Sequence, residues 1–409
     1  MSKAVLPDAE WRNASGLARV VAALADEHGG PRFVGGAVRD TLFGLQVTDV
    51  DLATMLLPEI VIDRLEAARI KAVPTGLDHG TVTAVADGKN YEITTLRRDV
   101  ATDGRRAVVA FATDWKEDAA RRDFTINALY ADPSTGDIFD YFGGLEDLKT
   151  GNVRFIGDAN ERIAEDHLRI LRYFRFLARF SKGPADLQAI AACAENTNSL
   201  MALSRERVAG ELLKLLALPD PRRTISLMIQ YRIFAPFLPE VADNAASALN
   251  RLYEREREWS CTPSLAARLL SLLPWDANTA QNVAMRLKLS NRMRADLARR
   301  LGGEPPTAKN VRAIAYRQGV DAARDSALLY ADDADFASCM EMLNGWEAPE
   351  FAIKGGDLIA RGLSVGPVVA QTLQAIENSW IAESFPPVTR INEIANQAVA
   401  EAMLASKKV

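Results

Sequence analysis

The sequence predicts an α+β fold: an N-terminal head built on a small mixed sheet with helices, followed by an all-helical remainder. Short apolar runs with a period of two alternate with Gly-rich turns up to about residue 150. From about residue 157, stretches with a helical period dominate to the end. The 409 residues exceed what one hydrophobic core usually supports, so we expect two to four domains.

Composition narrows the class of protein. With 48% hydrophobic and 25% charged residues, the chain is ordinary for a globular protein. It lacks an apolar run of about 18 residues, so we expect no membrane span, and its N-terminus lacks the apolar core of a signal peptide. Three widely spaced cysteines fit reduced thiols and a cytoplasmic location, and three histidines argue against a histidine-rich metallohydrolase domain. The net charge of −5 argues against a protein that binds nucleic acid non-specifically over its whole surface. It does not exclude RNA binding by a local basic stripe.

The first elements surround residues 32–54. We expect an amphipathic helix over residues 8–29, then a strand at Arg32–Val34 stopped by Gly35-Gly36. Residues 37–43 can form two helical turns ended by Gly44. Residues 47–53 alternate as a strand does.

Residues 32–54 contain candidate metal-binding and phosphate-binding residues. Asp49 and Asp51 point to one face of the expected strand, where two carboxylates repel each other unless a cation lies between them. Such hard oxygen ligands suit Mg²⁺, which commonly bridges carboxylates and substrate phosphates. The Gly35-Gly36 pair lets backbone amides approach a phosphate at a helix N-terminus. We therefore expect one short unit to hold both a metal ion and a triphosphate.

A helix over residues 60–68 and a strand from Lys71 follow. Residues 80–86 and 90–96 predict a hairpin that turns at Asp87-Gly88. Glu92 lies on its second strand, either as a third carboxylate facing the aspartate pair or as a solvent-exposed strand residue.

The next segments are expected to form the wall of a site. The charged stretch from residue 97 to about 110 predicts a loop, which either closes over a nucleotide or is plainly solvated. In residues 121–132 a buried apolar segment follows Arg121, Arg122 and Asp123, which indicates a site wall or an ordinary helix start. Residues 137–155 predict a strand, a turn at Gly143-Gly144 and a further extended segment.

A helix over residues 165–180 has two contrasting faces. One face gathers apolar side chains, and the opposite one is almost all arginine, the residue suited to phosphates and planar hydrogen bonding: Glu165, Arg169, Arg172, Arg175 and Arg179. Asp166 precedes Arg169 by three residues, so the two side chains either converge on a ligand or form a simple surface ion pair.

Further helices follow. Ser204 is expected to cap a helix that Pro219-Asp220-Pro221 ends, and residues 222–275 supply more helices. Residues 286–300 carry six basic residues and one acid, which indicates an RNA-backbone patch or a solvated helix face. Pro305-Pro306 marks a possible boundary, and Gly366-Pro367 starts a helix.

These motifs together resemble the bacterial tRNA nucleotidyltransferase (CCA-adding) and poly(A) polymerase family, class II, of the polymerase-beta superfamily. GGAVRD with the Asp49–Asp51 pair is similar to its motif A, RRDFTINAL at 121–129 to motif B, and DYFGGLEDLKTG at 140–151 to motif C. EDHLRILRYFRF from Glu165 resembles the nucleobase-selecting motif D, and SRERVAGEL at 204–212 motif E. The motifs follow the family's order over residues 31–216.

The resemblance implies an enzyme that adds C, C and A to the 3′ end of tRNA from CTP and ATP, without a nucleic-acid template. It implies a catalytic head (1–150), a neck with the base-selecting motif (151–220), and a body (221–305) and tail (306–409) that bind tRNA. No membrane association and no obligate protein partner are expected.

The resemblance also assigns roles by position. Asp49 and Asp51 would hold Mg²⁺, with Glu92 as a possible third carboxylate. The implied nucleotide-binding set is Gly35, Gly36 and Arg39 at the triphosphate, Arg122 and Asp123 at the ribose or phosphates, Asp166 with Arg169 at the base, and Glu165, Arg172 and Arg175 nearby. Adenine and cytosine each show an amino donor beside a ring-nitrogen acceptor, so one Asp/Arg pair can admit both and reject guanine and uracil.

Three alternatives stay open. A poly(A) polymerase shares these motifs, although residues 76–81 lack the basic segment usual in those enzymes. A partial enzyme would add only CC or only A. A non-catalytic RNA-binding protein is the third, and the retained Asp49 and Asp51 argue against it, because an unused carboxylate pair costs stability.

Overall fold

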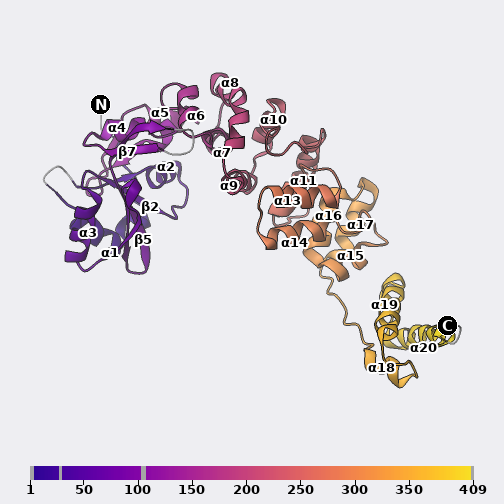
Figure 1. Ribbon diagram of the computed structural model, residues 1–409. Helices are drawn as coiled ribbons and strands as arrows, with labels where there is room; N and C mark the ends of the chain where they lie inside the picture. The colour runs from indigo at the N-terminus through magenta and orange to yellow at the C-terminus, as the bar shows by residue number, and fades with distance from the viewer. Residues whose placement is uncertain (1–3, 27–29, 103–106, 407–409) are drawn as a thin grey trace. The chain divides into compact units, whose positions relative to one another are not determined.

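The computed structural model describes residues 4–26, 30–102 and 107–406, which form an α+β structure as predicted. The chain divides into two compact units, Met1–Pro239 and Glu240–Val409 (Figure 1). All strands of the described residues lie in the first unit, and the second is helical. The finer division into head, neck, body and tail stays a prediction.

A seven-stranded mixed sheet forms the centre of the first unit, in the order β3-β4-β5-β2-β1-β8-β9. Its strands are β1 (Arg32–Val34), β2 (Val50–Thr54), β3 (Lys71–Gly76), β4 (Thr81–Ala86), β5 (Lys89–Thr95), β8 (Leu129–Ala131) and β9 (Ile138–Asp140). Strands β2 and β5 run parallel, and their register places Asp51 beside Glu92. The sheet thus brings together two carboxylates that lie 41 residues apart in sequence.

The hairpin predicted around Asp87-Gly88 is confirmed. Strands β4 and β5 pair antiparallel, with Ala86 opposite Lys89. Asp87 and Gly88 have φ values of 50° and 75°, the left-handed pair that a two-residue turn requires.

The N-terminal helix is shorter than predicted. A 3₁₀ turn η1 (Glu10–Asn13) precedes α1 (Ser15–Ala23), and the extended Ala14 separates them; residues 27–29 lie outside the described part. The helix expected after the Gly pair is confirmed as α2 (Gly36–Phe43), ended by the left-handed Gly44. Strand β2 starts at Val50, three residues later than expected, so Asp49 stands just before it.

The prediction of a loop from residue 97 to about 110 is wrong. Strands β6 (Arg97–Thr102) and β7 (Ala107–Phe111) pair antiparallel as a separate two-stranded sheet. The apolar run Ala107–Phe111 contains valine and phenylalanine, which favour strands, and it pairs with the charged stretch. The predicted closure over a nucleotide concerns residues 103–106 in part, which lie outside the described residues.

Residues 121–155 differ from their prediction in two places. The chain leaves α4 (Trp115–Ala120) and passes through a 3₁₀ turn, η3 (Thr125–Asn127), into β8, so the helix-start alternative is wrong. Residues 123–131 are buried throughout, which leaves no solvated helix face there. Helix α5 (Gly144–Thr150) then occupies part of the segment expected to be extended, and only Phe155 bridges to Phe124.

Helices complete the first unit: α3 (Pro58–Ala67), α6 (Ala159–Glu165), α7 (Arg169–Phe180), α8 (Leu187–Glu195), η4 (Thr197–Ala202), α9 (Arg205–Leu216) and α10 (Arg222–Gln230). The helix predicted from residue 165 is interrupted, because Asp166 is extended between α6 and α7. Its side chain accepts a hydrogen bond from Leu168 N (3.1 Å), a local bond that competes with the helix. Ser204 caps α9 as predicted.

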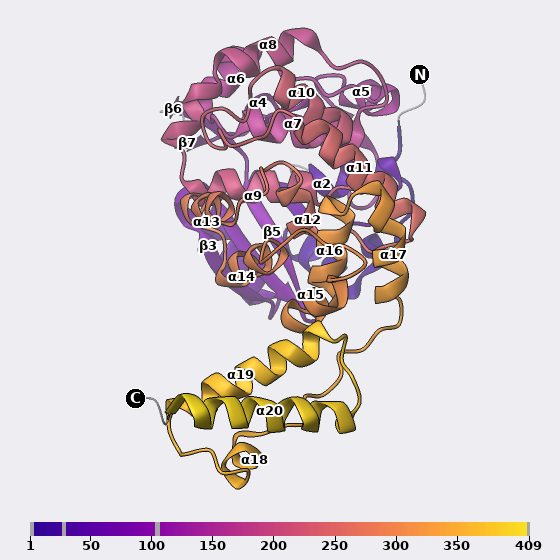
Figure 2. The same ribbon diagram turned by 90° about the vertical axis from the view of Figure 1, so that its right-hand side faces the viewer.

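The second unit contains α11 (Ala245–Glu258), α12 (Leu265–Leu270), α13 (Ala277–Arg286), α14 (Asn291–Arg300), α15 (Val311–Gln318), α16 (Val320–Tyr330), α17 (Asp333–Leu343), α18 (Gly355–Ala360), α19 (Pro367–Ala382) and α20 (Val388–Ser406). Helix α19 starts at Pro367, as predicted, and it packs side by side with α20 (Figure 2). Every helix of the described residues is too short or too polar to cross a bilayer.

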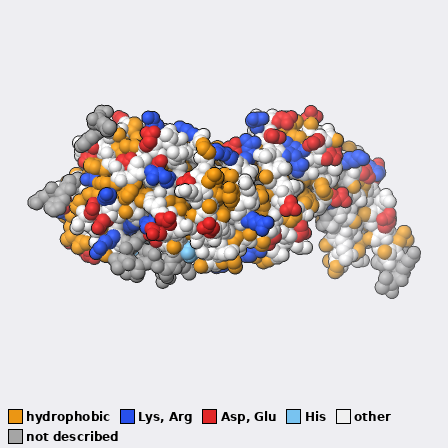
Figure 3. Space-filling model, turned by 90° about the horizontal axis from the view of Figure 1, so that it is seen from above, with side chains coloured by type: hydrophobic (Ala, Val, Ile, Leu, Met, Phe, Trp, Pro, Cys, Tyr) orange, Lys and Arg blue, Asp and Glu red, His pale blue; other side chains and the backbone are white. Residues whose placement is uncertain are grey.

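The basic stretch at residues 286–300 is partly neutralised inside the second unit. Arg286 pairs with Glu240, and Arg300 donates to the buried Asp325 (Nε to Oδ2, 2.7 Å). An RNA patch there can use the exposed Arg292 and Arg294, not Arg300. On the face seen in Figure 3, basic and acidic side chains of the described residues are interspersed, in keeping with the modest net charge.

Candidate active site

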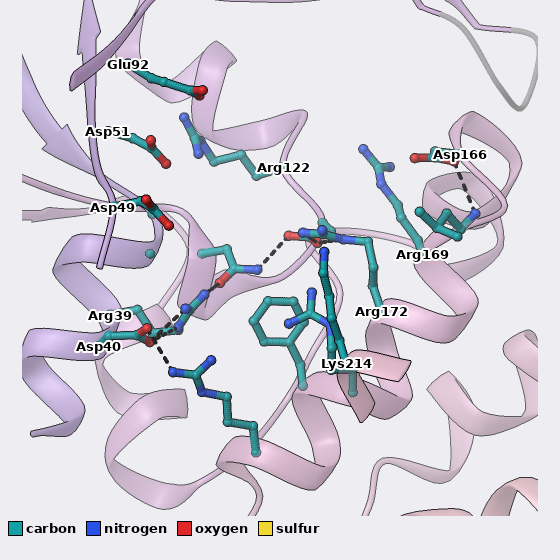
Figure 4. A pocket seen from close by; sticks show the side chains of 18 of the residues that line it. Arg39, Asp40, Asp49, Asp51, Glu92, Arg122, Asp166, Arg169, Arg172 and Lys214 are labelled. Carbon is teal, nitrogen blue, oxygen red and sulfur yellow. Dashed lines mark hydrogen bonds and ion pairs between the residues drawn. The ribbon is translucent and has the colours of Figure 1, made fainter. Parts of the chain in front are cut away.

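A pocket of about 910 Å³ opens in the first unit, a size within the range of small-ligand sites (Figure 4). Elements β2, β5, α2, α7 and α9 contribute to its wall. Its charged lining consists of six carboxylates and ten cations: Asp40, Asp49, Asp51, Glu92, Asp123, Asp166, Arg39, Arg97, Arg121, Arg122, Arg169, Arg172, Arg175, Arg179, Arg207 and Lys214. The excess of cations suits a polyanionic ligand.

Three of these carboxylates, Asp49, Asp51 and Glu92, lie together along one side of the pocket (Figure 4). Asp49 immediately precedes β2, Asp51 lies within it, and Glu92 is the neighbour of Asp51 on β5. Burial raises the pKa of Asp51 to about 6, helped by Glu92 and Asp49 and opposed by Arg122. This side of the pocket therefore favours a bound cation.

The donor set fits Mg²⁺ better than a metal held by protein alone. Among the described residues, no three His, Cys, Asp or Glu side chains form a group that could hold a metal. Mg²⁺ typically uses one or two carboxylates and takes its other ligands from water and phosphates. Asp49 and Asp51 supply such a pair, and the role of Glu92 as a third ligand stays a prediction.

The Gly pair opens α2 toward the pocket. Gly35 has φ 63° and ψ −116°, and a Cβ there would stand 3.4 Å from Arg122 Nη1. Glycine therefore allows the backbone to turn beneath that guanidinium. The free amides of α2 and the dipole of the helix favour an anion at this end.

A chain of hydrogen bonds connects α2 to α7. Arg39, whose pKa is lowered by burial, donates to Asp40 and to Asn127. Asn127 donates in turn to Asp123 Oδ1 (2.8 Å). Asp123 Oδ2 accepts from Arg172 Nε (2.7 Å), and although burial opposes it, Arg172 holds the pKa of Asp123 below its usual range. Asp123 thus positions Arg172.

Arg122 extends toward Asp51 and Glu92 (Figure 4). Its Nε donates to Tyr130 Oη (3.1 Å) and its Nη2 to Asp118 Oδ2 (3.1 Å). Asp118 was not predicted from the sequence, although it precedes Arg122 by four residues, the spacing of neighbours on one helical face.

The expected base readers lie across the pocket from Asp49 and Asp51 (Figure 4). Arg169 donates to Glu165, to Arg162 O (2.9 Å) and to Arg121 O (2.8 Å). The alternative of a simple Asp166–Arg169 ion pair is wrong. Arg169 pairs with Glu165, and Asp166 pairs with Arg207 of α9 (2.9 Å).

Glu165 differs from the rest of the predicted set. All of the other predicted site residues line the pocket, whereas Glu165 is not part of its lining and pairs with Arg169. Predicted residues Arg172 and Arg175 line it, and Arg175 Nε donates to the buried Glu211 (2.6 Å).

Several pocket residues were missed by sequence reasoning. Helix α9 contributes Arg207 and Lys214, and Glu211 lies on the same helix face between them. Their spacing of four and three residues was the available signal. Arg179, by contrast, belongs to the arginine face that the sequence predicted; it lines the pocket and pairs with Asp40 (3.1 Å).

Comparisons with known proteins agree with this arrangement. Residues 31–154 match the poly A polymerase head domain family, and residues 186–244 match "Probable RNA and SrmB-binding site of polymerase A". CCA tRNA nucleotidyltransferase 1, mitochondrial, of Homo sapiens is 34% identical over 378 residues, which cover 89% of this chain and 86% of that protein. The CCA-adding enzyme of Lacticaseibacillus paracasei is 34% identical over 371 residues, covering 87% and 88%.

Solved structures show the same fold. The Bacillus stearothermophilus CCA-adding enzyme in complex with CTP aligns with a TM-score of 0.75 at 28% identity, covering 96% of this chain and 98% of that one. The Thermotoga maritima CCA-adding enzyme complexed with tRNA aligns with a TM-score of 0.68 at 20% identity, a likeness of fold alone. Fold and pocket together define a nucleotidyltransferase. The chain belongs to the family of CCA-adding enzymes, the CCA tRNA nucleotidyltransferases.

Proposed function

We propose that this protein adds C, C and A to the 3′ end of tRNA, taking the nucleotides from CTP and ATP and releasing pyrophosphate. The observation that carries the proposal is the pocket itself. It sets the Asp49–Asp51 pair on one side and Asp166 with Arg169 on the other, around a space lined with arginines. Metal-binding carboxylates, phosphate-binding cations and a polar base reader are the parts that nucleotidyl transfer needs.

In this proposal the reaction depends on Mg²⁺. Asp49 and Asp51 would hold the ion, whose chemistry is to lower the pKa of the RNA 3′-hydroxyl and to neutralise charge on the leaving pyrophosphate. The chain's own cations position the triphosphate: Arg39 at the start of α2, Arg122 beside the carboxylates, and Arg172 and Arg175 on α7. Gly35 and Gly36 let the backbone approach the phosphates.

Asp166 and Arg169 would select the base. An arginine has five N–H donors, and three of those of Arg169 are used by Glu165, Arg162 O and Arg121 O. The two that are left can reach a ring-nitrogen acceptor, while Asp166 accepts from an exocyclic amino group. Guanine and uracil present these groups in the reverse order, and mispairing buried polar groups can cost about 10⁴-fold in specificity.

The remaining parts of the proposal concern RNA. We assign the body (221–305) and tail (306–409) to tRNA binding, with the exposed Arg292 and Arg294 as candidate phosphate contacts. The three widely spaced cysteines, which fit reduced thiols, support a cytoplasmic location.

A direct experiment tests the proposal. Purified protein is incubated with labelled tRNA that lacks its 3′ CCA, with Mg²⁺ and with CTP, ATP or both, and product lengths are read on a sequencing gel. The proposal predicts three added nucleotides with both substrates, and none for Asp49→Ala or Asp51→Ala. Long A tails would instead indicate a poly(A) polymerase, and two added C residues or one A would indicate a partial enzyme.

A further inference from the structure

Asp166, the proposed acceptor for the base amino group, is held by a residue from another helix. Arg207 Nη2 contacts both carboxylate oxygens of Asp166, Oδ1 at 3.1 Å and Oδ2 at 2.9 Å. Both side chains line the pocket. A single nitrogen therefore fixes both oxygens of the group on which base selection depends.

The backbone around Asp166 does not fix it by helical hydrogen bonding, because the residue is extended between α6 and α7. Its carboxylate is restrained by Leu168 N on one side (3.1 Å to Oδ1) and by Arg207 on the other. These three contacts use three of the carboxylate's four lone-pair sites, so one site on Oδ2 can still accept from a nucleobase.

Arg207 is itself anchored. It stands in the first turn of α9, where its backbone N–H donates to the capping Ser204 (3.4 Å). Four residues on, Glu211 holds Arg175 of α7. Helix α9 thus contacts the base-reading and phosphate-binding sides of the pocket through separate residues.

We propose that Arg207 is a positioning residue for nucleobase selection: it orients the Asp166 carboxylate so that it accepts from the amino group of cytosine or adenine. The inference rests on the proposed function and extends it to α9. A phosphate or RNA contact by Arg207 would lower the rate with every nucleotide alike, whereas a positioning role lowers the discrimination between nucleotides.

The test compares kcat/KM for CTP and UTP on tRNA lacking CCA. Misplacing a reacting group by about 1 Å can cost about 10²-fold, so Arg207→Met is expected to lower the CTP-over-UTP ratio by roughly 10- to 100-fold. Arg207→Lys should restore much of the ratio, since one nitrogen already contacts both oxygens. Combined with Asp166→Ala, the Arg207→Met change should lower the ratio no further.

Lys214→Met is the matched control. Lys214 lies on the same face of α9, lines the same pocket and loses the same charge, but its ion pair is with Glu211 (3.5 Å). It should leave the ratio unchanged whatever its effect on rate. An unchanged ratio in Arg207→Met, with kcat/KM reduced equally for CTP and UTP, overturns the inference while the proposed function stands; wild-type protein that adds no nucleotide overturns both. Arg207→Gln repeats the measurement should Arg207→Met fold poorly by circular dichroism.

Discussion

Replacing Asp118 by Asn perturbs the wall of the pocket while preserving its shape. The Asp118 side chain is 1% exposed and accepts from four donors: Arg121 Nε (2.9 Å), Arg122 Nη2 (3.1 Å), Tyr130 Oη (2.6 Å) and Arg97 N (3.3 Å). Asparagine offers one acceptor oxygen and turns an NH₂ group toward a guanidinium. Among the described residues, Asp118 is the only carboxylate that forms an ion pair with Arg121 or Arg122, so the change leaves both guanidinium groups without such a partner.

The magnitude follows from burial. Breaking a buried ion pair by removing one partner costs about 3–5 kcal/mol. Arg121 and Arg122 are 16% and 19% exposed, so solvent screens these pairs little. For a unit of this size, a loss of about 3 kcal/mol lowers the melting temperature by roughly 6–12 °C. Thermal unfolding followed by circular dichroism measures it, and a loss below about 1 kcal/mol would refute the reasoning.

The stability lost in Asp118→Asn should depend on pH, in a direction set by the pKa of Asp118. Burial opposes ionisation of Asp118, but Arg122, Arg121 and Tyr130 hold its pKa well below the usual range. A carboxyl whose folded-state pKa is depressed contributes stability above its unfolded pKa of about 3.9 and loses it as pH falls toward the folded value. The stability gap between wild type and Asp118→Asn should therefore be full above about pH 5 and shrink below about pH 4; a gap that widens on acidification contradicts the assignment.

Three further predictions concern specificity and the second unit. Asp166→Ala should relax the rejection of UTP and GTP in a misincorporation assay, and unchanged preference would argue against its role. Glu165→Gln should loosen Arg169 and lower the same selectivity by less than Asp166→Ala does, read as kcat/KM ratios; a larger loss would give Glu165 a direct contact. Arg300→Met removes the ion-pair partner of the buried Asp325, so it should lower the free energy of unfolding by about 3–5 kcal/mol, measured by urea titration, with little change in kcat well below the melting temperature.

Local signals made much of the first unit predictable. The Gly pair, the Gly44 stop and the Asp87-Gly88 turn each demand a backbone conformation that few sequences satisfy, and the structure has all three. The hairpin formed by β6 and β7 was missed because charge dominated its first strand, while the strand-forming run lay in the second.

Most of the candidate site was also predictable, because its residues fall in compact motifs. The side-chain partners that come from distant elements were not predictable. Asp166 was expected to meet Arg169 through sequence spacing, yet it binds Arg207, which lies 41 residues away on another helix. Glu211 is a buried carboxylate that pairs with Arg175 of α7, and only the packing of two helices brings these residues together. Spacing predicts neighbours within one element, whereas pairing between elements depends on tertiary structure.

The central claim is that one pocket joins metal-dependent transfer to selection of C and A. Sequencing the 3′ ends of tRNA lacking CCA, after incubation with this protein, Mg²⁺ and all four nucleoside triphosphates together, tests it most directly. We expect ends that read CCA and then stop. Ends that carry U or G, that continue as A tails, or that remain unextended would contradict it.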